Sequence, residues 1–143
     1  MAQEYLFNNN FIGAGWAFAP GHGTGVSGQG NVKLVQGDLD VAKSVFIILS
    51  TALGERVMRP EFGCGIHDLV FASPGTEVFG LVSYYIQQAL ERWEPRIEIE
   101  AIDVSVDQNA PECLLIDIKY KIVQINSSRN LVYPFYVIPR NED

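Results

Sequence analysis

The residues best suited to chemistry gather in one short segment, GERVMRPEFGCGIHDLVF, which spans residues 54–71. Within it, Cys64 and His67 lie three positions apart and Asp68 follows. A helical turn could therefore bring a nucleophile, a base and an orienting carboxylate together. Cys64, however, stands between two glycines. The apolar residues around it are expected to be buried: Phe62, Ile66, Leu69 and Phe71. A small buried thiol is the commoner use of such a cysteine, so the pattern does not favour cysteine catalysis.

The sequence gives little support for a zinc site or for a pair of catalytic carboxylates. The chain has two cysteines and two histidines, so a zinc site would need His22 from the glycine-rich N-terminal segment. Acidic residues lie near the expected ends of helices and strands, as glycoside cleavage would require: Glu55, Glu61, Asp68, Glu94 and Glu98. Nothing in their spacing places two of them across a cleft. We predict no catalytic residues, no metal and no cofactor, and keep a cell-wall glycan hydrolase as the alternative function.

Length and charge narrow the class of protein. The chain has 143 residues, 48% of them hydrophobic, a net charge of −7 and a pI of about 4.7. This length fits one domain with a hydrophobic core, and an acidic surface repels nucleic-acid phosphates. No apolar run approaches the roughly 20 residues of a membrane span, and a signal peptide is not recognisable. We expect no nucleic acid, no membrane, synthesis in the cytoplasm, and reduced thiols at Cys64 and Cys113.

The first 37 residues differ from the rest in composition. Eight of the 13 glycines fall there, most of them in the run PGHGTGVSGQG. Aromatic residues precede this run, among them Phe7, Phe11, Trp16 and Phe18. Glycine this dense does not hold a helix or strand without help, and neither a Walker nor a Rossmann pattern is present. We predict an extended arm over 1–37 that docks on a partner, with residues 2–31 mobile in the isolated protein and ordered only in the assembly. Residues 38–143 are predicted to form a single domain.

A first helix is expected before the 54–71 segment. After Gly37, Asp38 or Asp40 can cap its N-terminus and place negative charge where the helix dipole favours it. Apolar residues then recur at helical spacing as far as Leu53. Gly54 is expected to end this helix, as a glycine just past the last turn commonly does.

A second helix is expected from Pro74 to Trp93, with Ser73 as its N-cap. Its apolar residues form one broad stripe, which predicts a buried face. Pro95 ends it, because the residue before a proline is pushed out of helical geometry. Between the two helices, residues 66–70 are expected to form a single helical turn.

From Ile97 the apolar period changes to two, which predicts strands. The alternation slips near Ala101, so either a β-bulge lies there or the strand begins there. Residues 113–122 form the clearest strand pattern, with one face buried and one in water. After a turn at NSSRN, residues 131–138 are predicted to form a third strand.

These elements define the expected fold class. It is α+β: two main helices and a short helical turn packed on a small antiparallel sheet of three to four strands, with the glycine-rich arm at the N-terminus. Pro134 lacks an amide hydrogen, so its strand is expected at an edge or bulged. The free edges of such a sheet could accept a strand from another chain.

The 54–71 segment also has a structural interpretation. Pro60 biases Arg59 toward an extended conformation, and Phe62 can enter the core. Gly63 and Gly65 permit positive φ or a close backbone approach. The charged residues would point outward or pair with one another: Glu55, Arg56, Arg59, Glu61 and Asp68. The segment then serves as a rigid connector between two helices.

The stretch LSTALGERVMRPEFGCGIHDLVF resembles the signature of the lysozyme-like baseplate-wedge family of contractile machines. This family occurs in contractile phage tails, type VI secretion (as TssE) and extracellular contractile injection systems. Its pattern is a helix, then L-T-x-x-G-E-R, then R-P-x-F-G, then a short apolar helix. The matching residues are Leu49, Thr51, Gly54, Glu55, Arg56, Arg59, Pro60, Phe62 and Gly63. A second family mark, a Glu-Pro-Arg turn after the next helix, is matched by Glu94, Pro95 and Arg96.

The resemblance covers about residues 38–138 and implies a structural role, not an enzymatic one. It implies a small domain between the baseplate wedge and the first sheath ring, in six copies, that starts sheath assembly by offering a sheet edge to sheath subunits. Wedge scaffold proteins would hold its other side, and the N-terminal arm is a candidate contact for the tube or spike hub. The implied interface or corner-fixing residues are Glu94, Pro95, Arg96, Arg56, Arg59, Pro60, Phe62 and Gly63.

Three settings stay open for such a protein: a phage tail, a type VI system, or an injection particle released from the cell. The long arm favours the particle. A small intracellular adaptor of the same fold is a further alternative, and neighbouring genes for sheath, tube and spike would distinguish it.

Overall fold

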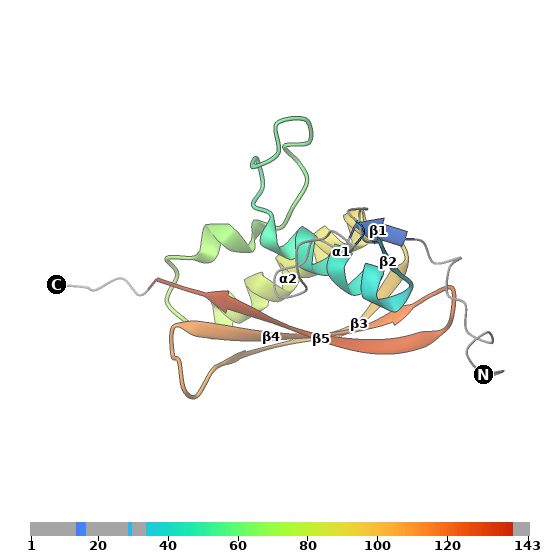
Figure 1. Ribbon diagram of the computed structural model, residues 1–143. Helices are drawn as coiled ribbons and strands as arrows, with labels where there is room; N and C mark the ends of the chain where they lie inside the picture. Colours follow the sequence, from blue (N-terminus) through green and yellow to red (C-terminus); the bar gives the residue numbers. More distant parts are fainter. Residues whose placement is uncertain (1–13, 17–28, 30–33, 139–143) are drawn as a thin grey trace. The chain divides into compact units, whose positions relative to one another are not determined.

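The computed structural model describes residues 14–16, 29 and 34–138 (Figure 1). Backbone contacts divide the chain into two compact units, Met1–Val45 and Phe46–Asp143. The elements in chain order are β1 (Ala14–Trp16), β2 (Leu34–Gln36), α1 (Asp38–Ser50), the 3-10 helix η2 (Gly65–Leu69), α2 (Thr76–Trp93), β3 (Ile97–Val106), β4 (Cys113–Ile122) and β5 (Ser127–Tyr136). Among the described residues, no helix is both long and apolar enough to cross a membrane.

The N-terminal unit contains two strands that the sequence did not reveal. β1 and β2 pair antiparallel, with Ala14 opposite Gln36 and Trp16 opposite Leu34. Each strand has three residues, too few to show an alternating pattern. The mobility predicted for the arm, and the partner contacts predicted for Phe7, Phe11 and Phe18, concern residues outside those that the structure describes.

Helix α1 begins where the sequence places it. Gly37 has φ 67°, and its carbonyl accepts the amide hydrogen of Val41 at 3.2 Å, the first bond of the helix. Asp38 and Asp40 both fall in the first turn, where the helix dipole stabilises negative charge. The predicted helix start is therefore confirmed.

The end of α1 is three residues earlier than predicted, at Ser50 instead of Leu53. The Thr51 carbonyl accepts the Cys64 amide hydrogen at 2.9 Å, and Ala52 forms a parallel β-bridge with Cys64. The backbone thus pairs with a later segment where the apolar spacing alone would have continued the helix. Leu53 leaves the core and is 53% exposed.

Helix α2 starts two residues after the predicted position. Its N-cap is Gly75, in extended geometry (φ −175°, ψ 168°), and not Ser73. One stripe of the helix is buried: Val82, Ile86, Ala89 and Leu90. At the other end, Glu94 leaves helical geometry with φ −127° and ψ 78°, as the following Pro95 requires.

The C-terminal unit is built on a three-stranded antiparallel sheet of order β3-β4-β5. The register shifts between Ile99 and Ala101 within a strand that begins at Ile97, which favours the bulge over the alternative of a strand that begins near Ala101. β5 begins at Ser127, four residues earlier than predicted, because the turn is formed by residues 123–126 and Asn126 adopts φ 50°. Pro134 lies in this outer strand, as expected.

The core lies on one face of this sheet. Alternate residues of β4 are buried: Leu114, Ile116, Ile118, Tyr120 and Ile122. Tyr133 on β5 meets the ring of Phe46 in α1 edge-on, with 5.5 Å between the centroids. Helix α2 and the C-terminal part of α1 cover this face (Figure 1), which confirms the α+β class.

Candidate functional site

The corner after α1 is closed by a very tight backbone approach. Gly63 has φ 126°, and a Cβ atom there would lie 2.3 Å from the Thr51 carbonyl oxygen. Only glycine fits this position, since both the dihedral angle and the space exclude a side chain. The same Thr51 oxygen accepts the Cys64 amide hydrogen at 2.9 Å. Gly63, predicted as a corner-fixing residue, therefore sets how residues 51–52 and 63–64 run together.

The loop of residues 53–61 projects from this corner and is braced at its base (Figure 1). The Gly54 amide donates to the Pro60 carbonyl at 2.7 Å, which closes the loop. The Glu55 carboxylate accepts the Ala52 amide hydrogen at 2.9 Å. Glu55, the acidic residue of the G-E-R motif, therefore caps the Ala52 amide at the corner.

A column of stacked side chains joins this loop to the end of α2. The Arg56 guanidinium lies over the Phe62 ring at 4.1 Å from its centroid. Phe62 packs on Trp93 with 5.1 Å between ring centroids, and Arg92 lies over Trp93 at 4.9 Å. Phe62 was predicted to enter the core, but it is only half-buried in this column. Cation–π contacts of this kind contribute about 0.5–1 kcal/mol at exposed sites.

The Glu-Pro-Arg turn follows this column directly. The Arg96 guanidinium donates twice to Glu94, at 2.6 Å to Oε1 and 2.8 Å to Oε2, so the pair is bidentate. The Glu94 side chain is 3% exposed and that of Arg96 is 23% exposed. The Arg96 carbonyl also accepts the Val123 amide hydrogen at 3.0 Å, which ties the turn to the end of β4. Pro95 lies at the surface between them.

Cys64 and His67 do not form a catalytic pair. Cys64 is fully buried, and burial raises the pKa of its thiol to about 11, so the thiolate is scarce near neutral pH. His67 Nε2 lies 2.8 Å from the Leu49 carbonyl, and its ring meets Phe135 edge-on. The His67 side chain therefore links η2 to α1 and β5, while the Cys64 thiol is buried. Phe71, expected to be buried, is 59% exposed.

We expect Cys64 to resist alkylation in the folded protein. At pH 8, iodoacetamide should leave both buried cysteines unmodified for hours, and both should react once guanidinium unfolds the chain. Because the folded-state pKa of Cys64 lies above its unfolded value, this thiol supports folding below about pH 9 and loses that effect as pH rises toward 11. Mass spectrometry of the tryptic peptides measures the labelling. Rapid labelling of Cys64 in the native protein would contradict its structural role.

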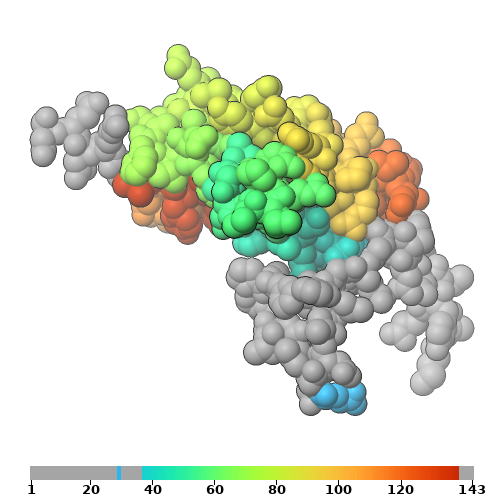
Figure 2. Space-filling view, turned by 90° about the horizontal axis from the view of Figure 1, so that it is seen from above, coloured from blue at the N-terminus to red at the C-terminus, as the bar shows by residue number. Residues whose placement is uncertain are grey.

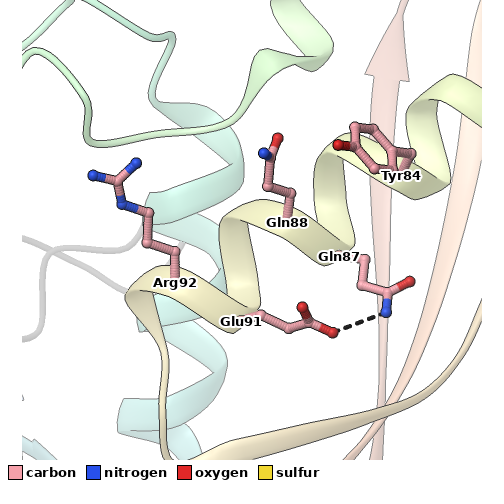
Figure 3. A pocket seen from close by; sticks show the side chains of 5 residues that line it. All are labelled: Tyr84, Gln87, Gln88, Glu91 and Arg92. Carbon is pink, nitrogen blue, oxygen red and sulfur yellow. Dashed lines mark hydrogen bonds between the residues drawn. The ribbon is translucent and has the colours of Figure 1, made fainter.

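Two of the hollows in the described part of the chain border α2. The larger, about 500 Å³, is lined by α2 residues alone: Tyr84, Gln87, Gln88, Glu91 and Arg92 (Figure 3). Its single carboxylate, Glu91, accepts a hydrogen bond from Gln87 at 2.8 Å. Such a lining offers no pair of acids for glycoside cleavage.

The smaller hollow, about 310 Å³, lies between the loop and α2 and brings Glu61 and Asp68 together with Arg92. Both acids are exposed to solvent, and a general acid at neutral pH needs an apolar enclosure to keep its proton. Glu94, a third candidate acid, is held by Arg96. Among the described residues, no group of three His, Cys, Asp or Glu side chains could hold a metal ion.

The structure places the predicted site residues in three settings. Arg56, Phe62 and Gly63 hold the corner, while Arg59 and Pro60 are exposed in the loop. Glu94 and Arg96 form the neighbouring ion pair. The sequence analysis missed the stacking of Arg92 on Trp93. It also missed the exposure of Val57 and Met58 at the tip of the loop. The signal for the stack was present, because Arg92 and Trp93 directly precede the Glu-Pro-Arg turn.

The pattern of the baseplate wedge protein gp25 family matches residues 35–127, and the chain belongs to this family. The baseplate wedge protein gp25 of Enterobacteria phage T4 is 28% identical over 83 residues. That match covers 58% of this chain and 62% of the phage protein, so it spans less than two thirds of the relative.

Solved structures show the same fold. A protein described as a tail lysozyme from Geobacter sulfurreducens is 50% identical, with a TM-score of 0.66 over 71% of this chain and 91% of that one. A chain in the six-fold symmetrised baseplate of the anti-feeding prophage is 25% identical, with a TM-score of 0.61 over 90% of this chain and 89% of that one.

Proposed function

We propose that this protein is a structural component of the baseplate of a contractile injection machine, where it links the wedge to the first sheath ring and nucleates the sheath. The observation that carries this proposal is the Glu94–Arg96 pair at the start of β3, an outer strand of the sheet. Membership of the baseplate wedge family supports the setting. After synthesis in the cytoplasm, the protein is incorporated into an assembled particle.

The geometry of the turn suggests how it acts. Glu94 ends α2, and Arg96 leads into β3, whose outer side pairs with no described strand. An outer strand presents backbone donors and acceptors that an extended segment of another chain can use. The buried ion pair fixes where this strand starts relative to α2. The proposed partner at this edge is an extension of a sheath subunit, while wedge scaffold proteins hold the opposite side.

We expect that Glu94→Ala combined with Arg96→Ala yields a folded monomer but no sheathed particles. Removing both charges avoids leaving one buried ion without its partner, so the domain survives. The loss should appear in electron micrographs of particles purified from producing cells. The matched control is Gln87→Ala with Glu91→Ala, which removes an exposed hydrogen-bonded pair 2.8 Å apart on α2, away from the β3 edge. Normal, full-length sheaths in the Glu94–Arg96 variant would remove the Glu-Pro-Arg turn from the proposal.

A further inference from the structure

The tip of the 53–61 loop carries two apolar side chains that are almost fully in water. Val57 is 95% exposed and Met58 is 91% exposed, more than any other large hydrophobic side chain that the structure describes. In Figure 2 the green atoms of this loop stand toward the viewer. Single exposed apolar residues are ordinary on a protein surface. Two consecutive ones at the tip of a projecting loop call for a separate explanation.

The loop holds this tip in place before any partner arrives. Gly54 bonds to Pro60 at 2.7 Å across the base of the loop, and the Phe62 amide donates to the Arg59 carbonyl at 3.0 Å. Arg56, at the start of the tip, is stacked on Phe62. A preorganised loop loses less conformational entropy on binding than a free one, so its exposed side chains contribute more to affinity.

The charge immediately beside the apolar pair is positive, although the whole chain carries −7 and the exposed acid Glu61 lies two positions after Arg59. Arg56 and Arg59 flank the apolar pair and are exposed. The nearest acid on one side, Glu55, has its carboxylate bound to the Ala52 amide at the base of the loop. A complementary surface would therefore have an apolar centre and a rim of carboxylates.

We propose that residues 56–59 form a docking plug that inserts Val57 and Met58 into an apolar, carboxylate-rimmed pocket on a different protein of the baseplate. This proposal rests on the proposed function and names a second contact of the same domain, apart from the sheet edge. Arg56 and Phe62 hold the plug upright, and Arg59 contacts the acidic rim. Met suits such a contact because its flexible, polarisable side chain adapts to an irregular pocket.

A second copy of this chain fits the plug less well than a different protein does. The larger hollow on α2 is lined mostly by polar side chains, and the lining of the smaller one includes Pro60 and Glu61 of the same loop. Exchange of plugs between two copies would bring identical faces together and produce a two-fold dimer. A ring of six copies, as the family resemblance implies, instead needs either heterologous contacts or another protein between the copies.

The plug is tested by photo-cross-linking in assembled particles. Met58 is replaced by benzoylphenylalanine in the full chain, particles are irradiated, and mass spectrometry identifies the joined peptides. We expect one product with another baseplate protein, at a segment rich in apolar and acidic residues. The control places the same group at Val123, which is 55% exposed in the β4–β5 turn. A product with a second copy of this chain, or no product above the Val123 level, would overturn the proposal.

Substitution separates this proposal from the proposed function. Val57→Ser with Met58→Ser should leave the unfolding midpoint close to that of the natural chain, because surface changes cost within about 0.5 kcal/mol. Affinity for the cross-linked protein should fall at least about tenfold. Unchanged affinity contradicts the plug. If this variant assembles normally while the Glu94–Arg96 variant does not, the plug alone is wrong. If both assemble normally, the role proposed for the Glu-Pro-Arg turn is wrong as well.

Discussion

Gly63→Ala is expected to lower the free energy of unfolding by about 3–5 kcal/mol, a large fraction of the stability of an ordinary domain. Alanine would adopt φ 126° only under strain, and its Cβ would lie 2.3 Å from the Thr51 carbonyl oxygen. A neighbouring backbone atom cannot turn away as a side-chain tip can. Relief would require residues 51–52 to separate from 63–64, which breaks the bond between Thr51 and Cys64.

Two other glycines provide matched controls for this substitution. Gly54 also has positive φ, 83°, but nothing lies within 4 Å of its Cβ position, so Gly54→Ala should cost about 1 kcal/mol from the backbone alone. Gly80 is exposed within α2 and also has open space, so Gly80→Ala should stabilise by up to about 1 kcal/mol. Urea unfolding followed by circular dichroism gives all three values. Equal effects at Gly63 and Gly54 would show that the close approach to Thr51 is unimportant.

Local sequence patterns predicted those helices and strands whose structure is decided by residues close to one another in the sequence. The alternation in residues 113–122 predicted β4 because one face of that strand is buried and the other is wet. The slip near Ala101 predicted the bulge, and Pro95 predicted the end of α2. Each of these signals acts within a few residues, so no knowledge of the rest of the chain was needed.

The features that were not predicted from the sequence depend on contacts between residues that are far apart in the chain. The end of α1 depends on a β-bridge between Ala52 and Cys64, and neither residue signals the other. The same holds for the stacked column, in which Phe62 meets a side chain of α2, Trp93. The resemblance to a family identified the corner residues, but only the contacts divide them into residues that brace the corner and residues at the surface. The boundary predicted between an arm at 1–37 and a domain at 38–143 stays a prediction.

Close to this corner, at the end of α2, the charged side chain of Glu94 is buried. Glu94 ranks with Thr51 as a buried polar residue in a core otherwise made of apolar side chains. Its carboxylate depends on two charge-assisted hydrogen bonds from Arg96. An ion pair in such a place is a weak source of net stability, but removing one partner is costly, because the remaining charge stays in a poorly solvated site.

Arg96→Ala is therefore expected to lower the free energy of unfolding by about 2–4 kcal/mol. Glu94→Ala should cost less, about 1–2 kcal/mol, because Arg96 is 23% exposed and can turn its guanidinium toward water. The double variant should cost clearly less than the sum of the two single variants, since it leaves neither charge behind. Arg96→Lys keeps the charge but loses the bidentate geometry, and its stability should fall between the natural chain and Arg96→Ala.

Urea unfolding of the four variants completes a double-mutant cycle that measures the coupling between Glu94 and Arg96. If the costs of the two single variants simply add, the pair contributes no coupling energy, and the turn must be held by Pro95 and its backbone bonds. If they do not add, the ion pair fixes the start of β3. In that case the sheet edge of the Arg96→Ala variant should accept a strand poorly even at temperatures where the domain remains folded, because the strand would start from a loosened turn.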